Sequence, residues 1–502
     1  MLMVSTAPPS SATGGAVLAF DQGTTNTKVL LVDSASGAVL ASASRPVQIS
    51  HPRPGWAEQD AEQLRDATFA AALECVDAAD GVTLQGISIS SQRESVVCWN
   101  TRTGSALGPV LGWQDARTAA WCARLEESNP GVDGLVRART GLSLDAMFSA
   151  PKMRAALDHA VAAGADIHDI ALGTVDAWLI WSLTGERLTE MGNASRTLLL
   201  DLESCSWDRE LLDLFGIPAA ALAEVRSSDA GFGRTRTGGP LPAGLPVLAV
   251  LADSHAAMYQ QGCTEPGTGK ATFGTGSSVM APIATSKGAT AGIATTLAWH
   301  IGGSPTYARE GNILAAGSAL DWMAAMLGSP EDASGGAYLT DLARGVEDSG
   351  GVSFVPAFSG LGAPYWDRSA DGLLLGVTAG TTRGHLARAA LESVAHQVAD
   401  VVEAIESDGL AHIDVLRADG GATRSHLLMQ TQADLLARPV QVGDAPEASA
   451  LGAATLARRV LGHHTDAAQP VTRVDPHPTD PGPAREAWKR AVARSRGLAT
   501  TD

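Results

Sequence analysis

Residues 19–33 read AFDQGTTNTKVLLVD, where an acidic, hydroxyl-rich turn joins two apolar runs. The runs at 17–20 and 29–32 are short and rich in Val and Leu, which is typical of paired strands. Gly23 allows a tight turn and lets an anion approach the backbone amides. An ionised Asp21 in the same turn would repel a phosphate unless a divalent cation lay between them. The stretch is therefore compatible with half of a magnesium–nucleotide site or with an ordinary polar hairpin turn.

Composition limits the classes of protein to consider. The chain has 502 residues, more than a single core usually supports, so two or more domains are expected. Its 36 basic and 54 acidic residues give a formal charge of −18, which disfavours nucleic acid or an anionic membrane surface as the main partner. No run of about 18 apolar residues occurs, so no membrane span is expected.

The cysteines and the N-terminus indicate the compartment. Five cysteines lie far apart without a CxxC spacing, which favours a reduced, cytoplasmic environment and argues against a zinc site. Residues 1–16 have the composition of a flexible tail and lack the basic start and apolar stretch of a signal peptide. A cytoplasmic protein is therefore expected.

Strand and helix signals are mixed along the whole chain. Besides the opening hairpin, strands are expected at 86–90, 97–99, 110–113, 247–251, 270–273 and 414–418. Helices are expected at 60–79, 116–127, 256–261, 317–327, 385–405 and 425–436, with a final helix in the last thirty-odd residues. Each half opens with a glycine-containing polar turn, which predicts two related α/β domains with a boundary near 253–262.

Three turns share one chemistry, namely 21–28, 274–278 and 419–422. Each places glycines beside small hydroxyl or acidic residues after a strand, where phosphate and sugar groups could bind. Together they resemble the arrangement of actin-like ATPases, in which the nucleotide lies in a cleft between two domains.

Longer motifs narrow this resemblance to the FGGY carbohydrate kinase family, and within it to glycerol kinases. The motifs are DQGTT at Asp21, PGWAEQD at Pro54, SQRE at Ser91, GWQDART at Gly112, GTVDAWLIWSLTG at Gly173, NASRT at Asn193, FGTG at Phe273, PAFSGLGAPYWD at Pro356 and DGGA at Asp419. The stretch 372–392 fits the second family signature. MFSAPK at Met147 fits most of the first, with Ala155 where Trp is usual. The resemblance extends from about residue 17 to about residue 460.

The resemblance implies a fold and an activity. The fold would be α/β, with two actin-like (ribonuclease H-like) ATPase domains and the active site in the cleft between them. Residues 17–256 would form the N-terminal domain that binds substrate and phosphate, and 257–502 the C-terminal domain that binds nucleotide. The activity would be ATP- and Mg²⁺-dependent phosphorylation of a primary hydroxyl of a small polyol, giving glycerol 3-phosphate and ADP if the polyol is glycerol.

Residue roles follow from the same resemblance. Asp253 matches the catalytic base and a substrate contact, although its position also suits a helix N-cap. Arg93 and Glu94 match the pair that grips substrate hydroxyls, and Trp113 matches an apolar wall of the pocket. Without the family, a surface ion pair and a core tryptophan would be the ordinary interpretations.

The nucleotide and metal positions can be assigned in the same way. Asp21 matches the residue that helps to hold magnesium through a water molecule, since magnesium keeps part of its hydration shell. Phosphate-contacting positions are matched by Thr24, Thr25, Asn26, Lys28 and Thr275. Positions around the adenine nucleotide are matched by Gly317, Asp321, Gly421 and Ser425, of which Asp321 replaces Gln and Ser425 replaces Asn.

The substrate pocket departs from glycerol kinases at three positions. Met147 stands in place of Tyr, Ser254 in place of Gln, and Ser278 in place of Phe. These exchanges predict a larger pocket, so a four- or five-carbon polyol or a ketose such as xylulose is the alternative substrate. The Arg93–Glu94 pair argues against a xylulose kinase, which usually has Met-His there.

A different class stays open, namely an actin-like ATPase or a ligand-binding pseudo-kinase without an acceptor. The presence of Arg93, Glu94 and Asp253 argues against an ATPase without an acceptor. Asp21, Thr25, Thr275 and Asp253 together argue against a pseudo-kinase. The sequence leaves homo-oligomerisation open.

Overall fold

The computed structural model describes residues 14–78, 81–287, 292–330, 333–443, 447–464 and 471–498. The chain forms two compact units. Unit 1 consists of Met1–Gln260, Thr296–Tyr307 and Glu447–Ala468, and unit 2 of Gln261–Thr295, Ala308–Pro446 and Gln469–Asp502. Most of the expected N-terminal tail lies outside the described residues, and Gly15 already begins the first strand.

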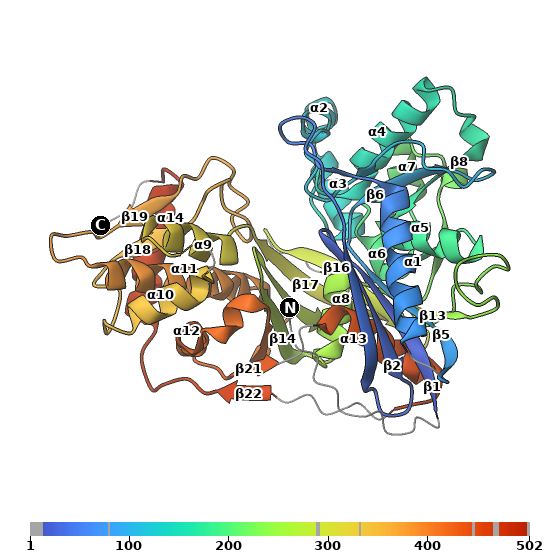
Figure 1. The fold of residues 1–502 in the computed structure, drawn as a ribbon. Helices are drawn as coiled ribbons and strands as arrows, with labels where there is room; N and C mark the ends of the chain where they lie inside the picture. The colour runs from blue at the N-terminus through green and yellow to red at the C-terminus, as the bar shows by residue number, and fades with distance from the viewer. Residues whose placement is uncertain are drawn as a thin grey trace. The chain divides into compact units, whose positions relative to one another are not determined.

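Unit 1 is built on a five-stranded sheet with the order β13-β5-β1-β2-β3 (Figure 1). Its strands are β1 (Gly15–Gln22), β2 (Asn26–Asp33), β3 (Val39–Pro46), β5 (Thr83–Ser91) and β13 (Val247–Ala252). β1, β2 and β3 form an antiparallel meander, whereas β1, β5 and β13 run parallel to one another. The predicted opening hairpin is therefore confirmed, and the parallel strands β5 and β13 extend the same sheet beside β1.

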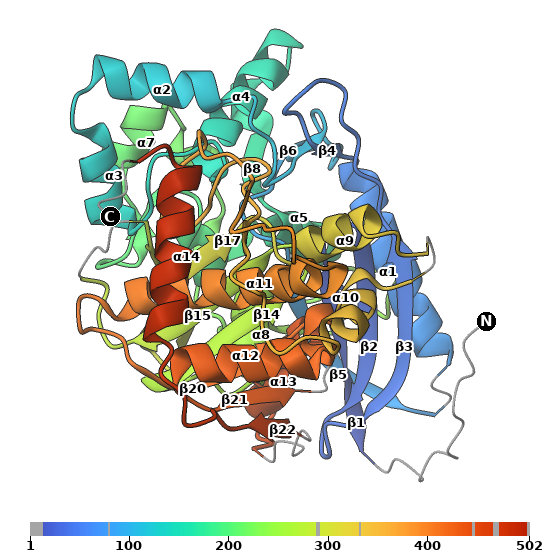
Figure 2. The same cartoon turned by 90° about the vertical axis from the view of Figure 1, so that its left-hand side faces the viewer.

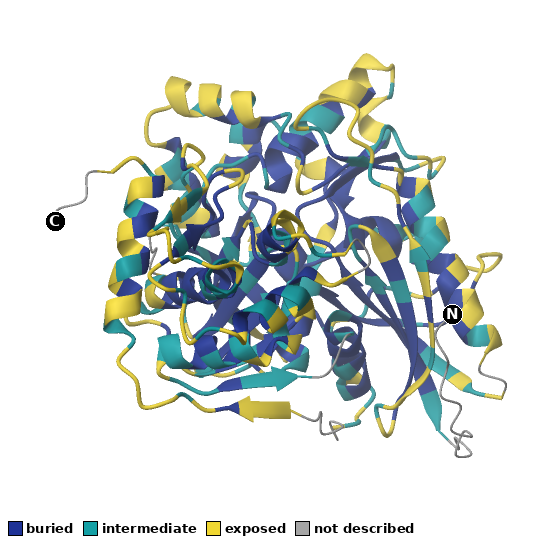
Figure 3. Cartoon of the chain, turned by 60° about the vertical axis from the view of Figure 1, so that its left-hand side comes forward, coloured by how far each residue is buried: buried dark blue, intermediate teal, exposed yellow. Residues whose placement is uncertain are grey.

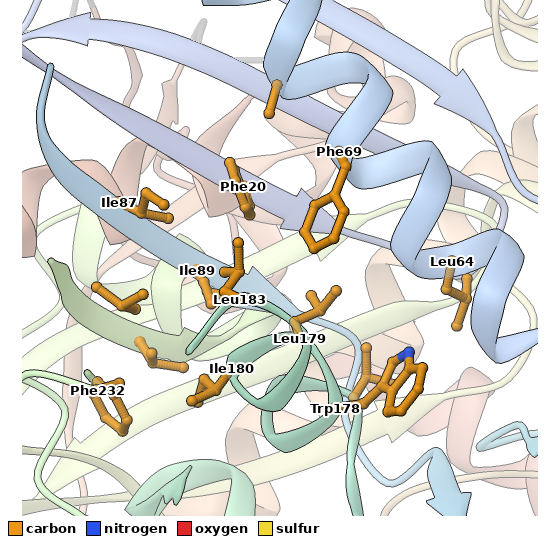
Figure 4. Close-up of a cluster of buried hydrophobic side chains, with 14 of the residues drawn as sticks. Phe20, Leu64, Phe69, Ile87, Ile89, Trp178, Leu179, Ile180, Leu183 and Phe232 are labelled. Carbon is orange, nitrogen blue, oxygen red and sulfur yellow. The ribbon is translucent and has the colours of Figure 1, made fainter. Parts of the chain in front are cut away.

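One face of this sheet packs against helices α1 (Ala61–Asp77) and α5 (Val175–Thr184). Phe20 and Ile89 from the sheet meet Phe69 from α1 and Leu179 from α5 in a single apolar cluster (Figure 4). Alternate residues of a strand point to one face, so β1 places Leu18 and Phe20 together in this core. The cluster fixes the sheet whose edge carries the candidate site.

Helix α13 (Ala448–Val460) belongs to unit 1 although it comes late in the sequence. It packs against β1, β5 and β13 and against helix α8 (Asp253–Gln260). Alanine and glycine on α13 permit this close approach, since a Cβ at Gly452 would lie 1.9 Å from the carbonyl oxygen of Ala256. The expected division at residues 256 and 257 into two continuous domains therefore does not describe this packing, because α13 completes the first sheet.

A second, four-stranded sheet of unit 1 has the order β4-β7-β6-β8. Its strands are β4 (Glu58–Gln59), β6 (Val96–Asn100), β7 (Val110–Leu111) and β8 (Ile170–Thr174). The remaining elements of unit 1 before β13 are α2 (Ala119–Ser128), α3 (Val132–Thr140), α4 (Ser149–Ala162), β9 (Leu188–Glu190), α6 (Met191–Ser195), β10 (Leu200–Asp201), β11 (Ser206–Trp207), α7 (Arg209–Phe215) and β12 (Glu224–Arg226). Trp113 follows β7 and Met147 precedes α4, so this layer carries two of the predicted pocket residues.

The seven-stranded sheet has the order β16-β17-β15-β14-β20-β21-β22. Its strands are β14 (Gly267–Phe273), β15 (Ser277–Ile283), β16 (Ala294–Ile301), β17 (Ser304–Ile313), β20 (Ile413–Asp419), β21 (Val440–Gly443) and β22 (Val471–Val474). β14 pairs antiparallel with β15 and parallel with β20, as β1 does with β2 and β5. This repeated hairpin-plus-parallel topology confirms the prediction of two related α/β halves.

Helices of unit 2 pack on one another and on its sheet. They are α9 (Gly317–Met326), α10 (Gly335–Ala343), α11 (Arg383–Glu406), α12 (His426–Leu436) and α14 (Gly482–Ser495), and β18 (Ser353–Val355) pairs with β19 (Leu373–Leu375). The last helix, α14, is drawn in red in Figure 2. Trp488 anchors it, because its indole donates a 2.7 Å hydrogen bond to Asp400 and stacks on His396 of α11. Figure 3 shows buried strands in dark blue and exposed helix surfaces in yellow.

The close packing of α13 gives a stability test. Gly452→Ala should lower the melting temperature strongly, because its new methyl group would overlap backbone atoms of α8 that cannot move independently. Gly134→Ala is the matched control, since a Cβ on α3 would have no neighbour within 4 Å. Alanine is the better helix former by roughly 0.5–1 kcal/mol, so this control should retain or raise the melting temperature. Equal melting temperatures for the two variants would contradict the packing described for α13.

Candidate functional site

Three parallel strands of unit 1 bring distant parts of the sequence to one sheet edge. Asp21 on β1 lies opposite Ser90 on β5, and Leu251 on β13 lies opposite the same Ser90. The carboxyl ends of parallel strands meet at one edge, where ligands commonly bind in α/β proteins. Asp21, the segment after β5, and Asp253 therefore lie at one edge of the sheet, where a ligand could contact all three.

The turn after Asp21 presents polar groups outward. The Gly23 amide donates a 3.0 Å hydrogen bond to the carbonyl of Asn26, which closes the turn. Thr25 and Asn26 are exposed, while the Thr24 hydroxyl accepts a 3.1 Å hydrogen bond from the indole of Trp113. The exposed side chains are available to a phosphate group. Trp113 is itself 37% exposed, so the alternative of a core tryptophan is wrong.

Asp21 lies in a negative environment. The pKa of Asp21 is raised to about 7, chiefly by burial and also by Asp253 and Glu447, whereas a hydrogen bond from Ser90 and the charge of Lys28 act in the opposite direction. Ser90 Oγ donates to Asp21 Oδ1 over 3.0 Å. Lys28 forms an ion pair with Glu447 at the start of α13. Two further carboxylates therefore act on Asp21, and the lysine beside it is paired with one of them, Glu447.

This donor set fits a magnesium ion better than it fits an unaccompanied phosphate. Mg²⁺ is usually held by one or two carboxylates together with water and substrate phosphates. Among the described residues no group of three or more His, Cys, Asp or Glu forms a complete metal cage. A partial site such as Asp21 is what a metal delivered with its nucleotide requires.

Arg93 and Glu94 are buried rather than exposed on the surface. Their exposed side-chain fractions are 7% and 3%, so the alternative of a surface ion pair is wrong. Arg93 Nε lies 3.5 Å from Asp253 Oδ1. β5 ends at Ser91, and Glu94 has a left-handed backbone with φ of 61°. This backbone turn removes the strand alternation that would point neighbouring side chains in opposite directions.

Asp253 combines two properties expected of it. It is the first residue of α8, and its Oδ1 accepts a 2.6 Å hydrogen bond from the Ser254 amide. Its side chain stays 34% exposed, so a substrate can reach it. Asp253 can therefore begin helix α8 and still present its carboxylate to a substrate.

Arg196 is a site residue that the sequence analysis did not single out. It is completely buried, and its Nε donates a 2.6 Å hydrogen bond to Glu94 Oε1. A buried carboxylate requires such a partner, since an unpaired charge inside a protein is costly. The motif NASRT contained the signal, because it places an arginine within an otherwise small, buried segment.

The two other pocket residues of unit 1 are partly exposed. Met147 lies in the loop before α4, and its amide donates a 2.8 Å hydrogen bond to Asp145 Oδ1. Ser254 lies in the first turn of α8 beside Asp253.

In unit 2, the turn after β14 lies against the start of α9. Amides of Ala316 and Ser318 each donate a 3.0 Å hydrogen bond to the Thr275 carbonyl, and Thr275 itself is exposed. Gly317 must be a glycine, since a Cβ there would lie 2.5 Å from the Gly274 carbonyl oxygen. Thr275 and Gly317 are thus brought together.

The other predicted residues of unit 2 differ in accessibility. Gly421 is exposed just after β20, which runs parallel to β14, and Asp321 is exposed on α9. Ser425 is 6% exposed and caps α12, with its hydroxyl 2.7 Å from that of Thr340. The Ser278 hydroxyl on β15 is buried and has no hydrogen-bond partner among the described residues. Besides its predicted place near the nucleotide, Ser425 thus has a structural role at the start of α12.

Comparisons with known proteins agree with the repeated fold. Residues 16–259 match the model of the FGGY family of carbohydrate kinases, N-terminal domain, and residues 269–460 match its C-terminal domain. An apulose kinase of Pectobacterium atrosepticum is 44% identical, with 96% of this chain and 98% of that protein covered. A glycerol kinase of Alkalilimnicola ehrlichii is 42% identical, with coverage of 97% and 99%. The crystal structure of Plasmodium falciparum glycerol kinase with ADP superposes with a TM-score of 0.89 at 27% identity, covering 97% of this chain and 99% of that one.

The raised pKa of Asp21 predicts a pH-dependent stability. A carboxyl group whose pKa is higher in the folded than in the unfolded chain makes the folded state less stable as pH rises between these two pKa values. For Asp21 the two values are about 3.8 and about 7. Asn cannot ionise, so Asp21→Asn should gain melting temperature relative to the parent as pH rises from 5 to 8 in the presence of a chelator.

Asp33→Asn is the control with the opposite sign. Burial raises the pKa of Asp33, but hydrogen bonds from the Ser36 side chain and backbone outweigh it and hold the pKa below its ordinary value. This variant should lose a constant amount of melting temperature between pH 5 and 8, because the parent carboxylate is ionised in both states over that range. Parallel curves for parent and Asp21→Asn would contradict the assigned environment of Asp21.

Proposed function

Because the chain belongs to the FGGY family of carbohydrate kinases, we propose that it transfers the γ-phosphoryl group of ATP to a primary hydroxyl of a small polyol, as glycerol kinases do. One observation carries this proposal. An accessible Asp253 lies 3.5 Å from the buried Arg93, beside a Glu94 that Arg196 holds in place. An ATPase without an acceptor would not need the buried Arg93 and Glu94 next to the accessible carboxylate of Asp253.

In the proposed reaction Asp253 accepts the proton of the substrate hydroxyl. The hydroxyl oxygen then bonds to the γ-phosphorus, and the bond from that phosphorus to the β-phosphate oxygen breaks to release ADP. Arg93 and Glu94 would donate to and accept from neighbouring hydroxyls, which orients the reacting one. Such positioning supplies a large part of the acceleration in phosphoryl transfer.

Magnesium and the phosphates would engage the turn of unit 1. Asp21 would hold the ion through water, and Thr24, Thr25, Asn26 and Lys28 would contact phosphate oxygens. The ion would neutralise charge that develops on the transferred group. The nucleotide would contact residues of unit 2, namely Thr275, Gly317, Asp321, Gly421 and Ser425.

The five cysteines of the chain are free, which supports the cytoplasmic location that such an ATP-dependent reaction needs. No helix among the described residues is long and apolar enough to cross a membrane.

Replacing the base gives the first functional test. Asp253→Asn should lower kcat by about 10² to 10⁴ while leaving the dissociation constant of Mg-ATP within a few-fold, because only the proton acceptor is lost. Asp66→Asn is a control on the exposed surface of α1 and should match the parent. Steady-state ADP release and a nucleotide titration measure the two quantities. Turnover of Asp253→Asn near the parent rate would exclude Asp253 as the base.

A larger acceptor is the second candidate substrate, and a specific observation favours it. Met147 and Ser254, both partly exposed, stand where glycerol kinases have Tyr and Gln, so one phenol and one amide are missing from the pocket. The relative that is 44% identical is named an apulose kinase, and this name supports an acceptor other than glycerol. A four- or five-carbon polyol or ketose would fill the space that glycerol leaves.

Pocket size can be tested by restoring the bulk. We expect the parent to show a higher kcat/KM for at least one four- or five-carbon polyol or ketose than for glycerol. Met147→Tyr, alone and with Ser278→Phe, should shift this ratio towards glycerol by about tenfold, the effect of one recovered hydrogen bond. Met147→Leu changes the volume little and adds no donor, so it should leave the ratio unchanged. If the parent enzyme already prefers glycerol strongly, the proposal of a larger acceptor is wrong and the protein is an ordinary glycerol kinase.

A further inference from the structure

Lys152 is a buried cation close to the proposed acceptor site but outside it. It lies in the first turns of α4 and has no exposed surface. Its Nζ donates hydrogen bonds to the carbonyl oxygens of Met147 and, over 3.3 Å, of Ala146. The side chain thus reaches back from the helix to the loop that carries a predicted pocket residue. Since it has no exposed surface, it does not contact a substrate.

Burying an ammonium group requires compensation from its surroundings. Burial lowers the pKa of Lys152 to about 8, against the opposing effects of Glu94, Asp115, Asp145 and the Cys122 thiol. The Cys122 pKa is itself raised to about 12 by burial, so this thiol is neutral near pH 8. The two carbonyl oxygens accept charge-assisted hydrogen bonds, which are stronger than those between neutral groups. The free energy of burying the Lys152 ammonium therefore depends on the position of the loop that carries the Ala146 and Met147 carbonyl groups.

The same loop, residues 146–149, also contacts Glu94 directly and through Arg196. The Ser149 hydroxyl donates a 3.1 Å hydrogen bond to the Glu94 carbonyl oxygen. The ring of Phe148 lies 5.2 Å from the guanidinium of Arg196, whose Nε bonds to the Glu94 carboxylate. Residues 146–149 therefore connect Lys152 to the backbone of Glu94 and, through Arg196, to its carboxylate.

We propose that Lys152 is a positioning residue for the acceptor, because its ammonium fixes the loop 145–149 that carries Met147 and supports Glu94. The inference rests on the proposed function, since it concerns the acceptor half of that reaction. Lys152 acts through the loop and takes no part in proton transfer. Its loss should therefore affect acceptor binding more than nucleotide binding.

Lys152→Met keeps the length of the side chain and removes its charge and donors. We expect its acceptor KM to rise by about tenfold to a hundredfold and its nucleotide KM to stay within twofold. Arg154→Met is the matched control on the same helix, because Arg154 pairs with Asp158 on the exposed side. It should retain both KM values. An acceptor KM of Lys152→Met equal to that of the parent overturns the proposal.

The pH dependence separates positioning from a general loss of packing. As pH rises above about 8, the parent ammonium loses its proton and with it the charge-assisted bonds to the loop. The acceptor KM of the parent should therefore increase between pH 7.5 and 9.5, while its nucleotide KM changes less. Lys152→Met should show no such increase. A parent acceptor KM that stays constant over this range overturns the proposal even if the variant does not fold.

Amide hydrogen exchange provides a readout that does not depend on activity. At one pH, Lys152→Met should exchange faster than the parent at residues 145–149, whereas Arg154→Met should not. Unchanged exchange in the folded variant overturns the proposal. A parent that phosphorylates no polyol or ketose refutes the proposed function, and the exchange experiment then still decides whether Lys152 fixes the loop.

Discussion

The parallel pairing of β1, β5 and β13 is the constraint on which the candidate site depends. Each strand contributes its carboxyl end to one edge, and the register places Asp21, the Arg93–Glu94 turn and Asp253 there. Helices cover these strands, so a shift of the register by one residue would expose the apolar face and move every functional group. The chemistry of the site is therefore set by the packing of Phe20, Ile89 and their neighbours as much as by the polar residues themselves.

Charge pairing is the second organising feature, and it differs between the two halves of the site. On the acceptor side, Glu94 is compensated by Arg196, and Arg93 by Asp253, so the charges are balanced before any ligand arrives. On the phosphate side, Asp21 is left in a negative field. This asymmetry suits a protein that binds a neutral polyol on one side and a metal-bound anion on the other. The negative net charge of the whole chain adds no attraction for an anionic ligand.

Much of the fold could be predicted because local patterns and tertiary packing agree. The hairpin at Asp21 and the strand that delivers Asp253 are short apolar runs bounded by turn residues, and both occur as expected. α13 could not be assigned to unit 1 in this way, because nothing local in an alanine-rich helix indicates which sheet it covers. The burial and the partners of Arg196 and Lys152 could not be predicted for a related reason. A sequence shows that a residue is charged, but burial and partner are properties of the fold.

The late position of α13 has a consequence for how the protein is made. Strands β1, β5 and β13 are complete once residue 252 has been synthesised, yet the helix that packs on them begins at Ala448. Until then the apolar surface it covers has no native partner on the nascent chain. Contacts of such large sequence separation slow folding, and exposed apolar surface on an incomplete domain favours aggregation. Synthesis of the first half alone should thus yield a chaperone client, and the two halves of the gene cannot be separated at the midpoint without leaving that surface open.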